Sequence, residues 1–144
     1  MPRIRTILYP TDGSPTAEAA ARFAEDIARP QGAKILVLGI VRRAFVGSVE
    51  NEKLTRAVTT SVREMVEVEA AKLNQTGVSA EPLIVLADSE HAGILDVAAD
   101  RNVDMIVMGT HGSSALARTV LGSVADRVVR HADVPILLVP PVEG

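Results

Sequence analysis

The sequence predicts an α/β domain in which a parallel, doubly wound sheet is covered by helices on both faces. Short apolar runs alternate with helical patterns along all 144 residues, a length that suits a single domain over 1–144. Hydrophobic residues make up 47% of the chain but aromatic residues only 2%, so aliphatic side chains must build the core. Such a composition is typical of short parallel strands that are buried on both faces.

The composition also excludes several classes of protein. There is no cysteine, which excludes disulfides and thiolate metal sites. The formal net charge is −3 without a long basic block, so we expect no nucleic-acid partner. No stretch is apolar enough to span a membrane, and we expect a cytoplasmic protein. His91, His111 and His131 lie in separate segments, and no pair has the spacing of metal ligands.

The first strand and the first helix have clear boundaries in the sequence. Residues 4–9 are an apolar run that predicts a strand. The pair Ser14-Pro15 predicts the start of a helix, because Ser caps free amides and Pro tolerates the first helical position. We expect Pro30 together with Gly32 to end this helix.

The second strand is followed by a loop and by the longest helix. Residues 34–41 are almost wholly apolar and predict the strand, and we expect the mixed stretch 42–51 to be a mobile loop. Residues 52–76 have the longest helical pattern, and Gly77 is a good C-terminal stop. The residues expected on the buried face of this helix are Leu54, Val58, Val62, Met65, Val66 and Leu73.

The remaining elements continue the alternation of strands and helices. Residues 79–87 predict a third strand, and a helix follows Asp88-Ser89. Residues 104–108 predict the fourth strand, 123–132 a helix and 134–139 the fifth strand. This alternation requires right-handed crossovers and a parallel sheet. Ligands of such sheets bind beyond the carboxyl ends of the strands, which selects the segments after strands one, two and four.

The segment 109–123, after the fourth strand, has the features of a polyphosphate site. Gly109 and Gly112 allow positive φ and remove side chains where backbone amides must approach oxygen atoms. Gly122 and Ser123 open the next helix, whose free amides and positive dipole end attract anions.

Polar side chains add to this interpretation. Arg118 is the one fixed positive charge inside the loop, and Asp126 is placed to complete a capping box with Ser123. The alternative is that the glycines only turn the chain and that Ser123 only caps a helix. Three glycines and a serine at this spacing, directly after a strand, favour the phosphate site.

These residues resemble the Gly-x2-Gly-x9-Gly-Ser/Thr nucleotide signature of the universal stress protein family. The likeness covers essentially the whole chain, including ILYPTDG, DMIVMGTHG and LGSVADRVVRHADVPILLVPP. The resemblance implies a Rossmann-like (adenine nucleotide α-hydrolase-like) sheet of five parallel strands in the order 3-2-1-4-5. It also implies that the chain binds ATP.

The resemblance further implies which residues contact ATP. Asp12 would hold the ribose hydroxyls, and the alternative is that it only caps the first helix. The residues implied to line the adenine pocket and flank the ribose are Pro10, Thr11, the backbone of Ile40 or Val41, Met108 and Gly109. Those implied to contact the phosphates, mainly through amides, are Gly112, Ser113, Gly122, Ser123 and Val124. Mg²⁺ would be carried on the phosphates and water.

Two positions depart from the family pattern. Many members have Arg and Gly where this chain has Ser113 and Ala115, and loss of the cation should weaken phosphate affinity without abolishing it. The pair Arg42-Arg43 follows the second strand and either helps to hold phosphates or a partner, or is the solvated start of a loop.

The functional hypothesis is an ATP-binding stress or signalling module whose occupancy alters the 42–51 segment and thereby a surface for an unknown protein partner. No catalytic residue is assigned, because no Gly-x-Ser-x-Gly elbow and no phosphate-loop lysine motif is present. One alternative is a slow ATPase, or a protein that autophosphorylates at Ser123 or Thr119. Another is a nucleotide-independent dimeric scaffold.

Two other classes of α/β protein, receiver domains and flavin-binding electron carriers, do not match the residues. A receiver domain needs a Lys after the fifth strand, where this chain has Pro140-Pro141. A flavin carrier needs aromatic side chains for stacking, and only Tyr9, Phe23 and Phe45 are available.

The apolar character of the last strand indicates that the protein forms an oligomer. The resemblance implies that strand 134–139 lies at the edge of the sheet, where an apolar strand invites pairing with another chain. It further implies a homodimer joined through this strand, with the prolines that follow stopping the pairing.

Overall fold

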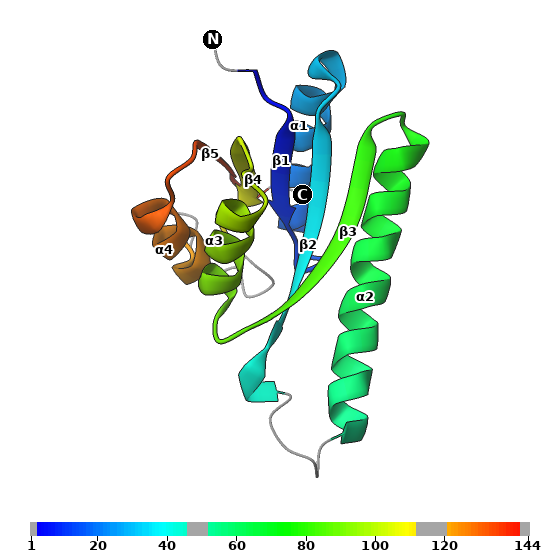
Figure 1. The fold of residues 1–144 in the computed structure, drawn as a ribbon, viewed down its shortest axis with the longest axis vertical. Helices are drawn as coiled ribbons and strands as arrows, with labels where there is room; N and C mark the ends of the chain where they lie inside the picture. Colours follow the sequence, from blue (N-terminus) through cyan, green and yellow to red (C-terminus); the bar gives the residue numbers. More distant parts are fainter. Residues whose placement is uncertain (1–2, 46–51, 112–120, 142–144) are drawn as a thin grey trace.

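A computed structural model describes residues 3–45, 52–111 and 121–141, and in these residues the predicted alternation of strands and helices is confirmed (Figure 1). The elements are β1 (Thr6–Pro10), α1 (Pro15–Gln31), β2 (Lys34–Arg42), the 3₁₀ helix η1 (Arg43–Phe45), α2 (Glu52–Gln75), β3 (Ser79–Ala87), α3 (Glu90–Asp100), β4 (Met105–Gly109), α4 (Ser123–His131) and β5 (Ile136–Val139). The described strands form one parallel sheet in the predicted order β3-β2-β1-β4-β5.

The strands of this sheet end at different levels. The β1–β2 ladder runs from Thr6 opposite Lys34 to Pro10 opposite Leu38. The β2–β3 ladder continues as far as Arg42. The carboxyl end of β2 therefore extends past the end of β1, with β3 still paired on its other side.

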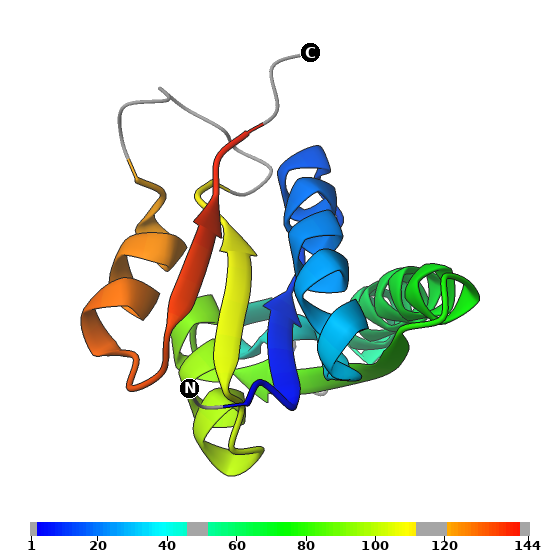
Figure 2. The same ribbon diagram turned by 90° about the horizontal axis from the view of Figure 1, so that it is seen from above.

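Helices cover both faces of the sheet, as the view from above shows (Figure 2). Side chains of a strand alternate between the two faces, so Ile7 and Tyr9 pack among residues of α1 and α2. Leu8, between them, packs among residues of α3 and α4. All three side chains are fully buried.

The first helix begins as predicted but ends differently. The Ser14 hydroxyl accepts a hydrogen bond from Ala17 N–H at 3.3 Å and caps the N-terminus. The helix runs through Pro30 to Gln31, so Pro30 does not end it. Gly32 ends it, because its left-handed backbone (φ 65°) turns the chain out of the helix.

The predicted buried face of α2 is wrong at Leu54. Leu54 is 51% exposed, and the buried residues of α2 are Val66, Glu69, Ala70 and Leu73. Val62 packs closely over Gly39 of β2.

Smaller boundary corrections affect several segments, including β1, which starts two residues later and ends one residue later than predicted. The expected loop 42–51 begins with Arg42 still in β2 and continues as η1, while 46–51 lie outside the described residues. The fourth strand starts and ends one residue later than predicted, and β5 starts two residues later. Among the described residues, no helix combines the length and the apolar character needed to cross a membrane.

The contact between α2 and β2 yields a stability prediction. A Cβ at Gly39 would lie 2.5 Å from Val62 Cγ1 and 2.8 Å from Val66 Cγ1. We therefore expect Gly39→Ala to lower the free energy of unfolding in urea by about 1–3 kcal/mol through overpacking. Val62→Ala makes room, so the double variant should lose less stability than the sum of the two single variants. Simple additivity would contradict the proposed collision.

Candidate functional site

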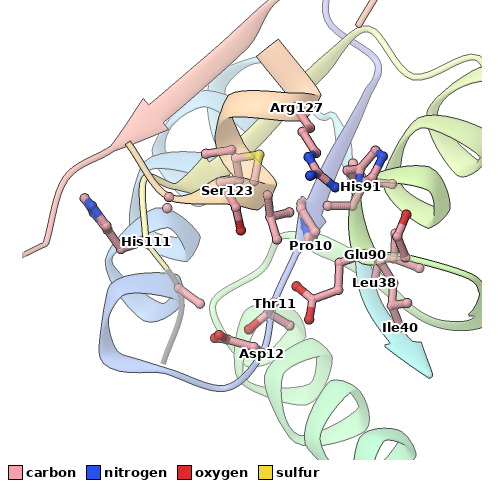
Figure 3. A pocket seen from close by; sticks show the side chains of 18 of the residues that line it. Pro10, Thr11, Asp12, Leu38, Ile40, Glu90, His91, His111, Ser123 and Arg127 are labelled. Atoms are coloured by element: carbon pink, nitrogen blue, oxygen red, sulfur yellow. The ribbon is translucent and has the colours of Figure 1, made fainter. Parts of the chain in front are cut away.

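A cavity of about 860 Å³ lies at the carboxyl ends of the strands, where the sequence argument places a ligand (Figure 3). Its walls come from the turn after β1, from the ends of β2 and β4, and from α2, α3 and the start of α4 with the residues just before it. The predicted site residues that line it are Pro10, Thr11, Asp12, Ile40, Met108, Gly109, Gly122, Ser123 and Val124. Three others, Gly112, Ser113 and Arg118, lie outside the described residues.

The turn after β1 is fixed by its own polar side chains. Gly13 N–H donates to Thr11 Oγ1 at 3.0 Å, and Ser14 N–H donates to Asp12 Oδ1 at 2.9 Å. Gly13 has a positive φ of 80°, which glycine adopts without strain. The Asp12 carboxylate is thus held at the rim of the cavity, while the helix-capping role that was the alternative for Asp12 belongs to Ser14, the N-cap of α1.

A buried phenol anchors this turn from below. Tyr9 Oη donates to Ala17 C=O at 2.8 Å, which ties β1 to the first turns of α1. Burial raises the pKa of the Tyr9 phenol above its ordinary value, so the group stays a neutral donor at physiological pH.

The end of β2 presents backbone groups to the cavity. Lys34 N–H donates to Arg5 C=O at 2.8 Å. Leu38 C=O accepts from Thr11 N–H at 2.9 Å, so the even-numbered residues of β2 face β1. Backbone groups alternate sides along a strand, and Ile40 therefore directs its N–H and C=O to the side where β1 has already ended.

Val41, the alternative to Ile40, does not line the cavity. Its side chain is 3% exposed, and its backbone is directed to β3, where it pairs with Leu86. Of the two neighbours, Ile40 is therefore the one whose backbone is turned toward the cavity.

Glycines at the end of β4 and before α4 permit close approach. A Cβ at Gly109 would lie 2.7 Å from Thr16 Cγ2, and one at Gly122 would lie 2.6 Å from Thr110 C=O. The expected positive φ is not found at Gly109, which is part of β4. Lack of a side chain, rather than left-handed backbone, is what both positions require.

The predicted capping box at α4 is wrong. Gly122 is the N-cap, so no side chain caps the helix, and Ser123 is the first helical residue. Asp126 does not reach back, because its carboxylate accepts from Arg130 Nε at 3.0 Å.

The backbone amides at the start of α4 differ in whether they already donate to an acceptor within the protein. Gly122 N–H already donates to Thr110 C=O at 2.9 Å. The first bond of the helix runs from Asp126 N–H to Gly122 C=O, so the amides of Ser123 and Val124 have no acceptor within the helix. These two amides, with the positive end of the helix dipole, form the part of the site suited to an anion.

Arg42, considered above as a contact for the phosphates or a partner, lines the cavity. The lining residues that the sequence did not place at the site come mainly from α2, α3 and α4, and they include Ser61, Val62, Met65, Ser89, Glu90, His91, Ile94, Leu121, Asp126 and Arg127. One feature of the sequence could have indicated the α3 residues. Strand 79–87 is about as long as strand 34–41, so the segment that follows it also lies at the carboxyl ends of the strands. Within the described part of the chain, His, Asp and Glu form no cluster suited to a metal ion.

Comparisons with known proteins agree with the fold. The model of the universal stress protein family matches residues 3–140. A universal stress protein of Thermus aquaticus is 35% identical, over 94% of this chain and 98% of the relative. The structure of MJ0577, a universal stress protein of Methanocaldococcus jannaschii, has a TM-score of 0.89 at 29% identity, over 99% and 100% of the two chains. A universal stress protein of Archaeoglobus fulgidus in complex with dAMP shares the fold, with a TM-score of 0.70 at 22% identity over 96% and 99%.

The contact between Gly122 and Thr110 can be tested through stability. We expect Gly122→Ala to lower the free energy of unfolding by about 1–3 kcal/mol, because the new methyl group meets a backbone carbonyl. Ser123→Ala should change it by less than about 0.5 kcal/mol, since the hydroxyl does not cap α4. Urea denaturation of both variants measures this, and the reverse ranking would restore the capping box.

Proposed function

The chain belongs to the universal stress protein family, and we propose that it is an ATP-binding member that acts as a nucleotide-dependent stress or signalling module. The observation that carries the proposal is the backbone of Ile40, turned toward a cavity of suitable size beyond the end of β1. The dAMP complex of the more distant relative supports an adenine nucleotide as the ligand.

The adenine would be recognised by main-chain groups. Ile40 C=O is suited to accept from the N6 amino group, and Ile40 N–H is suited to donate to N1. The ring would lie against aliphatic side chains, since Pro10, Leu38, Ile94 and Met108 line the cavity there. Backbone recognition of this kind favours adenine over guanine, whose groups at the same two positions have the opposite hydrogen-bonding character.

The ribose and the phosphates would follow from the base toward α4. Asp12, held at the rim by Ser14 N–H, is placed to accept hydrogen bonds from the ribose hydroxyls. Ser123 and Val124 offer the amides for the phosphates, while Gly122 lets the start of α4 approach the end of β4 closely. We expect Mg²⁺ to be carried on the phosphates rather than by protein side chains.

A nucleotide bound in this cavity would affect a protein partner through the segment after β2. Arg42 lines the cavity, and Arg43 in η1 forms an ion pair with Asp88 at 2.9 Å, just before α3. A ligand in the cavity would therefore change the surroundings of Arg42, at the start of segment 42–51. We expect this module to act in the cytoplasm, on a protein partner.

The ribose contact gives a test of the proposed site. Asp12→Asn keeps an oxygen for Ser14 N–H but removes the charge, so the turn should survive while ATP affinity falls about tenfold. Affinity for 2′,3′-dideoxy-ATP, which lacks the hydroxyls, should be the same in variant and wild type. Isothermal titration calorimetry measures both affinities.

The matched control is Asp26→Asn on the exposed side of α1, which makes the same charge change away from the cavity. It should bind ATP as the wild type does. Absence of ATP binding to the wild type up to millimolar concentration would overturn the proposal. An equal loss in Asp12→Asn and Asp26→Asn would reject the role of Asp12.

We also propose a homodimer through β5, because the two edges of the sheet differ. On the β3 edge, Asn74 Nδ2 donates to Ala80 C=O at 3.1 Å and Asn74 Oδ1 accepts from Ala80 N–H at 2.9 Å. Pro82, the next outward-facing residue of β3, has no N–H to offer. This edge is therefore protected by its own chain against pairing with another strand.

The β5 edge has no comparable protection among the described residues. Pro135 and Val139 accept hydrogen bonds from β4, so the backbone groups of Ile136 and Leu138 alternate to the outside. Their side chains are half-buried and apolar, which suits a strand of a second copy.

A lysine on each edge distinguishes the two surfaces. Ile136→Lys places a charge on the β5 edge, and we expect it to convert the dimer to a monomer in sedimentation equilibrium. Leu86→Lys makes the same change at an outward-facing position of β3, which is 47% exposed, and should leave the mass unchanged. A monomeric wild type, or dissociation by Leu86→Lys alone, would contradict the β5 interface.

A further inference from the structure

Arg127 lies in the cavity although it belongs to neither the glycine segment nor the start of α4. It is on the second turn of α4, four residues after Ser123 and three after Val124, so all three residues share one face of the helix. Figure 3 shows its side chain pointing from α4 into the cavity, toward the side where His91 of α3 lies. The direction of Cβ in a helix takes the side chain back toward the N-terminus.

The next arginine of the same helix behaves differently. Arg130 forms an ion pair with Asp126 at 3.0 Å and is not part of the cavity wall. Arg127 forms no ion pair with any residue that the structure describes. Its guanidinium is therefore available to a ligand, and Arg130 provides a natural comparison.

The stereochemistry of a nucleotide indicates which part of the ligand would meet Arg127. In the common anti conformation about the glycosidic bond, the imidazole edge of a purine lies on the side of the 5′-phosphates. If the phosphates bind at Ser123 and Val124 and the ribose hydroxyls at Asp12, the imidazole edge is turned toward α4. Atom N7, the hydrogen-bond acceptor of that edge, then faces the side of the cavity that Arg127 occupies.

Building on the proposed function, we propose that Arg127 is a specificity-determining residue that donates a hydrogen bond to N7 of the purine. Arginine commonly donates to N7 of guanine in nucleic acids, together with O6, and a single N–H of its planar fork can donate to N7 of adenine in the same way. The cavity would then read the base from two directions: Ile40 reads N1 and the amino group, and Arg127 reads N7. Pyrimidine nucleotides, which lack the imidazole ring, would lose the second contact.

The experiment compares ATP with 7-deaza-ATP, in which a C–H group replaces N7, by calorimetry on three proteins. The wild type should bind ATP roughly tenfold more tightly than 7-deaza-ATP, as expected for one charge-assisted hydrogen bond. Arg127→Met should bind the two nucleotides equally. Arg130→Met, the matched control, should keep the preference of the wild type.

Other outcomes would overturn the inference. A wild type without preference, or an Arg127→Met variant that keeps it, would show that N7 is not read by this residue. If Arg127→Met lowers the affinity for both nucleotides by the same factor, Arg127 contacts the phosphates instead. Failure of the wild type to bind any nucleotide would overturn the proposed function itself, which separates the two claims.

Discussion

The last hydrogen bond of the β1–β2 ladder, from Thr11 N–H to Leu38 C=O at 2.9 Å, fixes the geometry of the cavity. After this bond the chain leaves the sheet through a turn held by the side chains of Thr11 and Asp12, while β2 continues beside β3. A strand that is paired on one side only must turn every second N–H and C=O toward open space. At Ile40 this open space is the cavity, so the stagger of two strands creates both the room for a ligand and the groups that can recognise it.

Close contacts at three glycines hold the walls of the cavity together. Val62 of α2 packs on Gly39, one residue before Ile40, and Met65 packs on Gly13, one residue after Asp12. Gly122 approaches the carbonyl of Thr110 and brings the start of α4 to the end of β4. In a densely packed interior such contacts transmit displacement. A ligand that shifts the turn after β1 would therefore also act on α2, whose first turns are exposed.

Much of the fold could be predicted from the sequence, because the signals are local. Alternating apolar runs, Ser14-Pro15 and Gly32 fix elements through their own backbone chemistry. The strand order came from the resemblance rather than from periodicity, which says nothing of which strands are neighbours. The exposed Leu54 was misjudged because an apolar stripe does not reveal where the surface that covers it ends.

The site was predictable to a lesser extent, for a related reason. Residues next to strand ends, such as Asp12 and Gly109, follow from the rule for parallel sheets. Arg127 and His91 come from the sides of helices and reach the cavity only through the packing of α3 and α4, which spacing along the chain does not encode. The capping box failed because Gly122, not Ser123, occupies the N-cap.

Titration of the wild-type protein with ATP and with GTP tests the central claim most directly. If Ile40 reads the base through its backbone, ATP should bind at least about tenfold more tightly, because guanine presents a carbonyl where adenine presents an amino group. Equal affinities, or a preference for GTP, would contradict recognition of adenine by the staggered end of β2.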